Sequence, residues 1–135
     1  MAPFYYRFPQ LLSTETGWLV RATRGGLPAG RYFFLEYYCD DLSCDCRYVL
    51  LQVWEKRWIV SAPVCINYGW EPEEFYAGWA PRETCAAALE SRLPQPDLAL
   101  ALLRFFQSRM MPDRTYLARL KRRYRMFRRS LYRRN

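Results

Sequence analysis

The chain has 135 residues, of which 51% are hydrophobic and 25% are charged, so a single folded domain is favoured and a wholly disordered chain is excluded. It contains no histidine, which excludes histidine general acid–base catalysis, Ser-His-Asp and Cys-His nucleophile pairs and histidine metal ligands. The formal net charge is +8, and no apolar run approaches the roughly 18 residues that span a bilayer, so we expect no transmembrane helix.

The first half of the chain has the pattern of β-strands. Residues 18–22 form a short apolar piece, and 31–39 (RYFFLEYYC) are rich in aromatic side chains that favour strands. Two further strands are predicted over 46–55 and 58–70, joined by a two-residue turn at Lys56-Arg57. The predicted core positions of these strands are Phe33, Leu35, Val49, Leu51, Val53 and Ile59.

The second half of the chain has the pattern of helices. Pro94 and Pro96 separate an Ala-rich segment from a strongly apolar one, and Pro112 ends the apolar one. Asp113 then has the residue type and the position of an N-cap for the last helix. The predicted helices cover residues 71–79, 83–93, 97–111 and about 114–133.

The last predicted helix combines a narrow apolar stripe with a dense positive charge. Residues 104–135 contain twelve Lys or Arg and one acid, whereas residues 1–103 contain nine Lys or Arg and twelve acids. We therefore divide the chain into a body, residues 1–111, and a basic helical arm, residues 112–135. The apolar stripe consists of Leu117, Leu120, Tyr124, Phe127 and Leu131, and is predicted to pack within the chain. The residues predicted to contact a polyanion or another partner are Arg119, Lys121, Arg122, Arg123, Arg125, Arg128, Arg129, Arg133 and Arg134.

Four of the five cysteines fall within 27 residues, in the order C-x4-C-x-C-x18-C. The N-terminal residues lack the basic start and apolar run of a signal peptide, so clustered thiols indicate metal ligands before disulfides. Cys39, Cys44 and Cys46 fall on one predicted hairpin loop. With the two-residue turn, Cys65 would pair with Tyr48 and lie diagonally from Cys46, about 7–8 Å away. The predicted site is a structural zinc ion held by Cys39, Cys44, Cys46 and Cys65.

Other interpretations of the cysteines stay open. An iron–sulfur cluster is the alternative cofactor, since plant-type ferredoxins use C-x4-C-x2-C and a distant cysteine. Reduced thiols without any metal are a further alternative. Asp40, Asp41 and Asp45 are substitute ligands if Cys65 does not coordinate. Cys85, in the Ala-rich segment, is expected to be a small buried side chain.

Three stretches of the chain together resemble a known group of proteins: residues 27–53 (LPAGRYFFLEYYCDDLSCDCRYVLLQV), 66–71 (INYGWE) and 113–128 (DRTYLARLKRRYRMFR). They resemble uncharacterised bacterial proteins with a C-x4-C-x-C cluster, matched here by Cys39, Cys44 and Cys46; some members end in a SEC-C-type zinc motif. This chain ends in SLYRRN instead and has no such motif. The resemblance implies a bacterial protein of the cytoplasm and supplies no activity.

The sequence thus predicts an α+β fold, with a small antiparallel sheet of three or four strands followed by helices. It predicts a non-catalytic zinc-binding module that binds nucleic acid or a ribonucleoprotein through the basic helix, with Tyr116, Tyr124 and Tyr132 available to stack on bases. The alternative is an accessory subunit that docks on an acidic protein surface. No glycine-rich phosphate loop and no nucleophile with an adjacent base is present, so we expect no enzyme.

Overall fold

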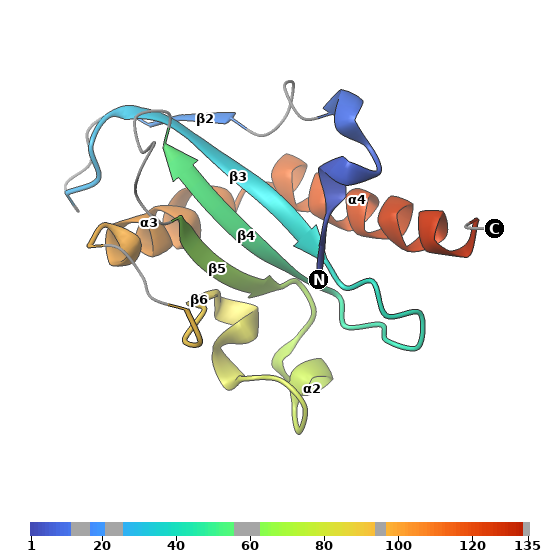
Figure 1. Ribbon diagram of the computed structural model, residues 1–135. Coiled ribbons are helices and arrows are strands. Elements are labelled where there is room, and N and C mark those ends of the chain that lie inside the picture. Colours follow the sequence, from blue (N-terminus) through green and yellow to red (C-terminus); the bar gives the residue numbers. More distant parts are fainter. Residues whose placement is uncertain (12–16, 21–25, 56–62, 94–96, 134–135) are drawn as a thin grey trace.

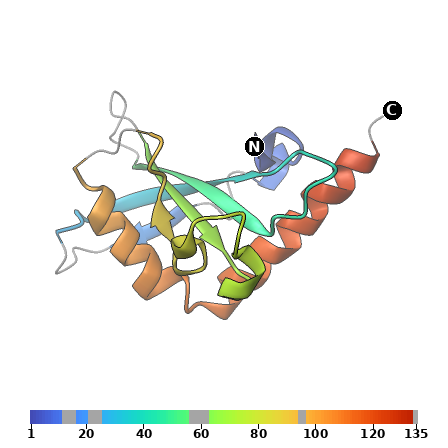
Figure 2. The same cartoon turned by 90° about the horizontal axis from the view of Figure 1, so that it is seen from below.

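The computed structural model describes residues 1–11, 17–20, 26–55, 63–93 and 97–133. In this part of the chain, an antiparallel sheet is covered on one face by two helices, α3 (Ala99–Phe105) and α4 (Arg114–Tyr132), which diverge from the turn between them (Figures 1 and 2). The predicted α+β fold with an antiparallel sheet and a C-terminal basic helix is confirmed.

The sheet contains six strands within the described residues, rather than three or four. The order across the sheet is β1-β3-β4-β5-β6, and β2 also pairs with β3. Sequence patterns find the longer strands and miss β1 and β6, because two residues are too short to show any alternation. The strands are β1 (Ala2–Pro3), β2 (Gly17–Val20), β3 (Gly30–Tyr38), β4 (Tyr48–Glu55), β5 (Val64–Gly69) and β6 (Ala88–Leu89).

Residues 32–38 of β3 and all of β4 alternate between buried and half-buried side chains. On β4, Val49, Leu51 and Val53 are fully buried, as predicted. On β3 the predicted face is wrong: Phe33 and Leu35 are only half-buried. The buried side chains of β3 are Tyr32, Phe34, Glu36 and Tyr38, and Ile59 lies outside the described residues.

The predicted register of β5 against β4 is also wrong. Cys65 pairs with Gln52 and Tyr48 pairs with Gly69, which is a shift of four residues from the register that a two-residue turn gives. Cys65 therefore lies opposite a residue four positions into β4 from Tyr48, about 13 Å along the strand at the usual rise per residue, whereas Cys46 precedes β4. The turn predicted at Lys56-Arg57 lies outside the described residues.

Helix α4 begins as the sequence predicts. Asp113 has extended backbone angles, and its Oδ1 accepts a hydrogen bond of 3.0 Å from the backbone N–H of Tyr116. The predicted apolar helix 97–111 is present as α3 followed by a π-helical turn, η4 (Phe106–Met110). Leu102 and Phe106 on this helix are fully buried against the sheet.

The predicted Ala-rich helix over 83–93 is wrong. The structure has a 3-10 helix, η3 (Arg82–Ala86), then Ala87 with a positive φ of 65°, then β6. The backbone N–H of Glu90 donates to the carbonyl of Cys65 at 2.9 Å, so pairing with β5 replaces continuation of the helix. The predicted helix 71–79 is reduced to one short turn, α2 (Glu73–Tyr76).

Helix α4 belongs to the core of the protein, because its apolar stripe packs on the sheet. The ring of Phe127 lies 5.9 Å from that of Tyr38, and the ring of Tyr124 lies 5.2 Å from that of Trp70. The N-terminal turns η1 (Phe4–Tyr6) and η2 (Pro9–Leu11) lie beside α4 and contribute Phe4 to the same core (Figure 1). The intramolecular packing predicted for the stripe is confirmed, and the hydrophobic core continues across the boundary predicted at residue 111.

Candidate metal centre and cationic helix face

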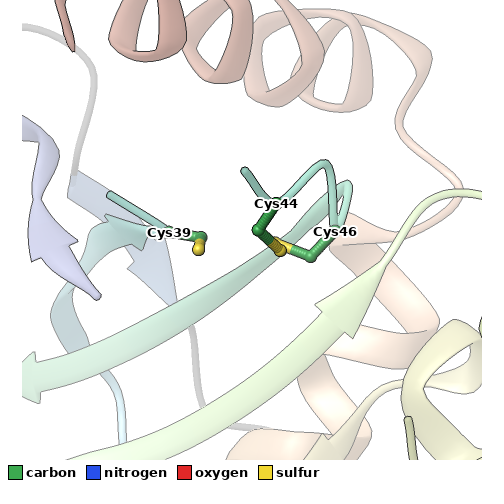
Figure 3. A group of neighbouring side chains, drawn as sticks. All are labelled: Cys39, Cys44 and Cys46. Atoms are coloured by element: carbon green, nitrogen blue, oxygen red, sulfur yellow. The ribbon is translucent and has the colours of Figure 1, made fainter. Parts of the chain in front are cut away.

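Three cysteines lie on the loop between β3 and β4. Cys39 directly follows β3, Cys46 lies two residues before β4, and Cys44 is between them. Their Sγ atoms all lie within 4.8 Å of one another (Figure 3). The hairpin thus gathers the three thiols that the sequence places on it.

These three thiols form a group that could hold a metal ion. Zinc binds thiolates at about 2.3 Å in tetrahedral geometry, which places the sulfur atoms about 3.8 Å apart. The sulfur atoms therefore need to close in by no more than roughly 1 Å to bind zinc. Among the described residues, the group contains no carboxylate and no fourth cysteine.

Burial, together with the neighbouring thiols of Cys39 and Cys44, raises the pKa of the Cys46 thiol to about 12. Burial also raises the pKa of Cys44. The backbone N–H of Tyr48 donates to the Cys46 sulfur and opposes the rise. Because their pKa values are raised, the thiols of Cys44 and Cys46 are protonated at neutral pH when no cation is bound, and a bound cation would displace their protons.

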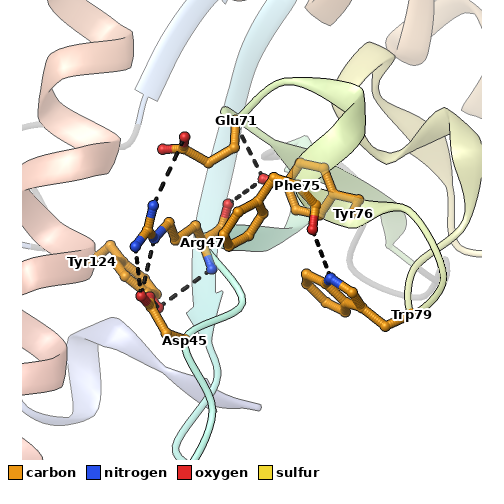
Figure 4. Close-up of polar contacts among 7 residues, drawn as sticks. All are labelled: Asp45, Arg47, Glu71, Phe75, Tyr76, Trp79 and Tyr124. Carbon is orange, nitrogen blue, oxygen red and sulfur yellow. Dashed lines mark hydrogen bonds and ion pairs between the residues drawn. The ribbon is translucent and has the colours of Figure 1, made fainter.

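The loop that carries the cysteines is held by its own turn and by two tyrosines from outside it. Asp41 Oδ1 accepts from the backbone N–H of Ser43 at 2.9 Å and from its Oγ at 2.7 Å, which fixes a tight turn. Arg47, next to Cys46, has a positive φ of 49°. Its N–H donates to the hydroxyl of Tyr124 at 3.3 Å, and its carbonyl accepts from the hydroxyl of Tyr76 at 2.6 Å (Figure 4). These bonds hold a backbone conformation that a non-glycine residue rarely adopts.

The side chain of Arg47 ties the loop to the segment after β5 (Figure 4). Its Nη2 lies 2.9 Å from Asp45 Oδ2 and its Nη1 lies 3.9 Å from Glu71, while the guanidinium lies over the ring of Phe75 at 4.8 Å. Asp45 also accepts a hydrogen bond of 2.6 Å from Tyr124. The hydrogen bonds from Arg47 and Tyr124 hold the pKa of Asp45 below its usual value, so its carboxylate is committed to this network.

Helix α4 also holds the cysteine loop directly, through Arg128. Its Nη1 donates to the carbonyl of Asp41 at 2.7 Å and to that of Cys39 at 3.4 Å, and its Nη2 donates to the carbonyl of Leu42 at 3.2 Å. One guanidinium thus gathers three carbonyls of the loop. The loop that carries the cysteine cluster is therefore attached directly to the basic helix α4.

The remaining predicted ligands lie elsewhere. Cys65 is buried on β5 opposite Gln52, outside the group of three thiols. Cys85 lies on η3 and is half-buried. Asp40, the third substitute ligand considered, accepts from the N-terminal amine of Met1 at 3.5 Å.

One face of α4 points away from the sheet and is strongly cationic. Arg122, Arg125, Arg129 and Arg133 follow one another at spacings of three, four and four residues, and all are exposed. Residues 114–133 contain no acid, and none of these four arginines forms an ion pair within the described part of the chain. We call these four residues the outward face of α4.

Some of the predicted contact residues have structural roles instead. Arg123 is fully buried, and its Nη1 donates to Glu36 at 2.8 Å and to the hydroxyl of Tyr5 at 2.6 Å. Arg128 holds the cysteine loop, and Arg119 lies over the ring of Tyr116 at 5.1 Å. The prediction that Arg123 contacts a partner is therefore wrong.

The remaining residues of the predicted contact set differ in their exposure where the structure describes them. Lys121 is half-buried, and Arg134 lies outside the described residues. Of the three tyrosines considered for base stacking, Tyr116 and Tyr124 are buried, and Tyr132 is 66% exposed.

No family model matches the chain, and neither a curated protein nor a solved structure matches it. The described part of the chain contains no helix that is both long and apolar enough to cross a membrane. The resemblance to the bacterial C-x4-C-x-C proteins stays a prediction.

Sequence reasoning missed the residues that brace the site. Tyr76 and Tyr124 bind the backbone of Arg47, and Arg7 from the N-terminal segment donates to the carbonyl of Ser130 on α4 at 3.3 Å. A positive φ at Arg47 leaves no mark in the sequence. Arg7 lies in an irregular stretch with no periodicity, so no local signal separates it from any other surface arginine.

Proposed function

We propose that this protein is a non-catalytic nucleic-acid-binding module whose outward face of α4 contacts the phosphates of the bound strand. The observation that carries the proposal is the run of Arg122, Arg125, Arg129 and Arg133 on one exposed, acid-free helix face. Arginine presents a planar fork of donors that matches phosphate geometry. Among the described residues, no acid forms an ion pair with this face.

The rigidity of the helix supports this function. The opposite side of α4 is anchored by Leu120, Tyr124 and Phe127 in the core and by the buried pair of Arg123 with Glu36. The outward arginines are therefore presented from a fixed backbone, so binding loses little backbone entropy.

In the same proposal, Cys39, Cys44 and Cys46 hold a structural zinc ion that staples the β3–β4 hairpin. The three thiolates are within reach of one cation, and they lie on a loop that is braced by α4 and by the α2 segment. A thiolate ligand set fits zinc better than it fits cations that prefer carboxylate ligands. Zinc there would stabilise the loop that Arg128 grips. In this proposal the metal is structural: it stabilises the loop that binds α4 and takes no part in a reaction.

The test compares two charge-matched variants. Arg122→Gln with Arg125→Gln removes two charges from the outward face, and Arg104→Gln with Arg109→Gln removes two exposed charges outside α4. We expect the first pair to weaken binding of a fluorescent single-stranded RNA by at least about tenfold in anisotropy titrations, and the second pair to change it by less than about threefold.

Equal losses for the two variants would overturn the role of the outward face. Capture of partners with and without nuclease separates the nucleic-acid function from the accessory-subunit function. Recovery that nuclease abolishes supports nucleic-acid binding. Recovery of one protein that nuclease leaves unchanged, and that Arg122→Gln with Arg125→Gln abolishes, would instead assign the outward face to an acidic protein.

A further inference from the structure

A groove lies between the N-terminal segment and the C-terminal half of α4. Its volume is about 410 Å³. Three arginines from two separate parts of the chain converge on it, together with two apolar side chains and one serine. The lining residues are Arg7, Phe8, Met126, Arg129, Ser130 and Arg133.

The N-terminal wall of the groove is fixed before any ligand binds. Arg7 donates to the carbonyl of Ser130 at 3.3 Å, and its guanidinium lies over the ring of Phe127 at 5.6 Å. Phe8 stacks on Phe4 with 4.7 Å between ring centroids, and Phe4 is fully buried. A wall that is held in this way does not need to be ordered on binding, which favours affinity.

The charge of the groove fits an anion. Three guanidinium groups line it, and none of the described residues that line it carries a carboxylate. The C-terminal end of α4 lies nearby and carries a partial negative charge of about half an elementary unit, which the three full positive charges outweigh. Arginines crowded around one cavity repel one another, and a bound phosphate relieves that repulsion while accepting charge-assisted hydrogen bonds.

The apolar part of the groove indicates what accompanies the phosphate. Phe8 and Met126 offer a flat ring and a polarisable thioether beside the arginines. A free base can lie on such a surface, whereas the bases of a duplex have their faces covered by their neighbours.

We propose that this groove binds one nucleotide of a single-stranded nucleic acid. The phosphodiester lies between Arg7, Arg129 and Arg133, and the base lies on Phe8 and Met126. The inference rests on the proposed function, since Arg129 and Arg133 also belong to the outward face of α4. It adds the class of substrate: single strands over duplexes.

The first experiment uses the full-length protein and three labelled probes of equal length: a single strand of ten thymidines, the corresponding abasic strand, and a duplex. Wild type is expected to bind the single strand at least about fivefold more tightly than the abasic strand or the duplex. Arg7→Gln should weaken binding of the single strand by at least about fivefold, whereas Arg104→Gln, which removes an exposed charge outside the groove, should change it by less than about twofold. Equal affinity of wild type for all three probes, or equal effects of the two substitutions, would overturn the groove.

The second experiment uses small ligands, so it tests the groove even if the protein binds no long strand. Thymidine monophosphate and inorganic phosphate are titrated separately into labelled protein, and the Nε–Hε resonances of the arginines are followed by NMR. We expect saturable shifts confined to Arg7, Arg129 and Arg133 with both ligands, and tighter binding of the nucleotide. Chemical-shift changes spread evenly over all exposed arginines would indicate diffuse, non-specific anion binding and would overturn the groove.

The two experiments separate the two proposals. If Arg122→Gln with Arg125→Gln weakens nucleic-acid binding and Arg7→Gln does not, the outward face stands and the groove is wrong. If wild type does not bind long strands but thymidine monophosphate shifts the three groove arginines, the groove is a site for a free nucleotide, and both the proposed function and the single-strand substrate are wrong. Should Arg7→Gln unfold the N-terminal segment, Arg7→Lys keeps the charge but loses the planar fork, and is expected to show a smaller loss of affinity in the same direction.

Discussion

Arg123 and Arg122 are adjacent in the sequence and have opposite surroundings, so substituting each by methionine tests the described packing of α4. The side chain of Arg123 is 1% exposed and is bonded to Glu36, whose side chain is equally buried. Methionine keeps the apolar stem of Arg123 and removes its charge. Arg122 is exposed on the outward face, and the same substitution there removes an equal charge from a solvated position.

The expected cost follows from what Arg123→Met leaves behind. Glu36 would retain the hydroxyls of Tyr38 and Tyr5, at 2.7 and 3.4 Å, and would lose the one ion pair that the described residues give it. Breaking a buried ion pair from one side costs about 3–5 kcal/mol, because the remaining charge is buried and uncompensated. Arg122→Met should change the free energy of unfolding by no more than about 0.5 kcal/mol.

The pH dependence of this variant gives a second test. Burial raises the pKa of Glu36, and Arg123 opposes the rise, so the pKa of Glu36 rises further in Arg123→Met. A carboxyl group whose pKa is higher in the folded than in the unfolded state costs stability above its unfolded pKa and stops costing it as the pH falls. The destabilisation should therefore shrink as the pH is lowered toward about 4.3, the pKa of glutamate in an unfolded chain.

The assay is urea denaturation of Arg123→Met, Arg122→Met and the double variant Arg123→Met with Glu36→Gln. The double variant should recover part of the loss, because the stranded carboxylate is gone. A loss below about 1 kcal/mol for Arg123→Met, equal to that for Arg122→Met, would refute the reasoning that α4 is locked to the sheet by this pair.

Three further predictions concern the metal, the pH and the core. Cys44→Ser should reduce zinc from about one ion per chain to near zero by elemental analysis, with a lower melting temperature, because metal binding and folding are linked. Hydrogen bonds from Arg92 hold the pKa of Glu90 down to about 2, so their stabilisation should be complete above about pH 4.5 and be lost as the pH falls toward 2; Glu90→Gln should flatten that part of a pH-dependent stability curve. Leu102→Ala should lower the free energy of unfolding by about 2–5 kcal/mol in urea titrations, because Leu102 is fully buried.

Two of these predictions have a matched control variant, and the third has a result that would contradict it. Cys85→Ser removes a thiol outside the cluster and should leave the zinc content unchanged; equal zinc in both serine variants would contradict the three-thiol site. Leu100 is 50% exposed, so Leu100→Ala should cost well under half as much as Leu102→Ala, and equal costs would contradict the packing of α3. An unchanged acid limb in Glu90→Gln would contradict the bond to Arg92.

The elements that the sequence predicts well are those that local rules determine. Asp113 after Pro112 marks the start of α4 by residue type alone, and the capping bond is present. The hairpin loop brings Cys39, Cys44 and Cys46 together because two antiparallel strands must begin and end there. In both cases the partners are close in sequence.

The errors fall where distant partners decide the outcome. On β3 both faces are rich in aromatic side chains and each carries one charged residue, so alternation alone cannot say which face is buried. Glu36 marks the buried face, against intuition, because Arg123 neutralises it from 87 residues away. Arg123 lies within the basic run KRRYR (121–125), and nothing in the local sequence distinguishes it from Arg122.

The position of Cys65 failed for a related reason. Register depends on the length of the connection between strands, and the assumed two-residue turn moved β5 by four positions. Because the side-chain period of a strand is two, an even shift keeps Cys65 on the expected face and still moves it far from Cys46. The prediction of Cys65 as a fourth ligand therefore depended on the assumed length of the turn.

The most direct measurement of the central claim, that the outward face of α4 binds nucleic acid, is the salt dependence of affinity. Logarithmic plots of the binding constant for a single strand against salt concentration have a slope of about −0.7 for each phosphate contact. Removing two contacts with Arg122→Gln and Arg125→Gln should make the slope shallower by about 1.4, and removing Arg104 and Arg109 should leave it unchanged. We expect this difference between the two charge-matched variants, and identical slopes in wild type and both variants would contradict binding by the outward face.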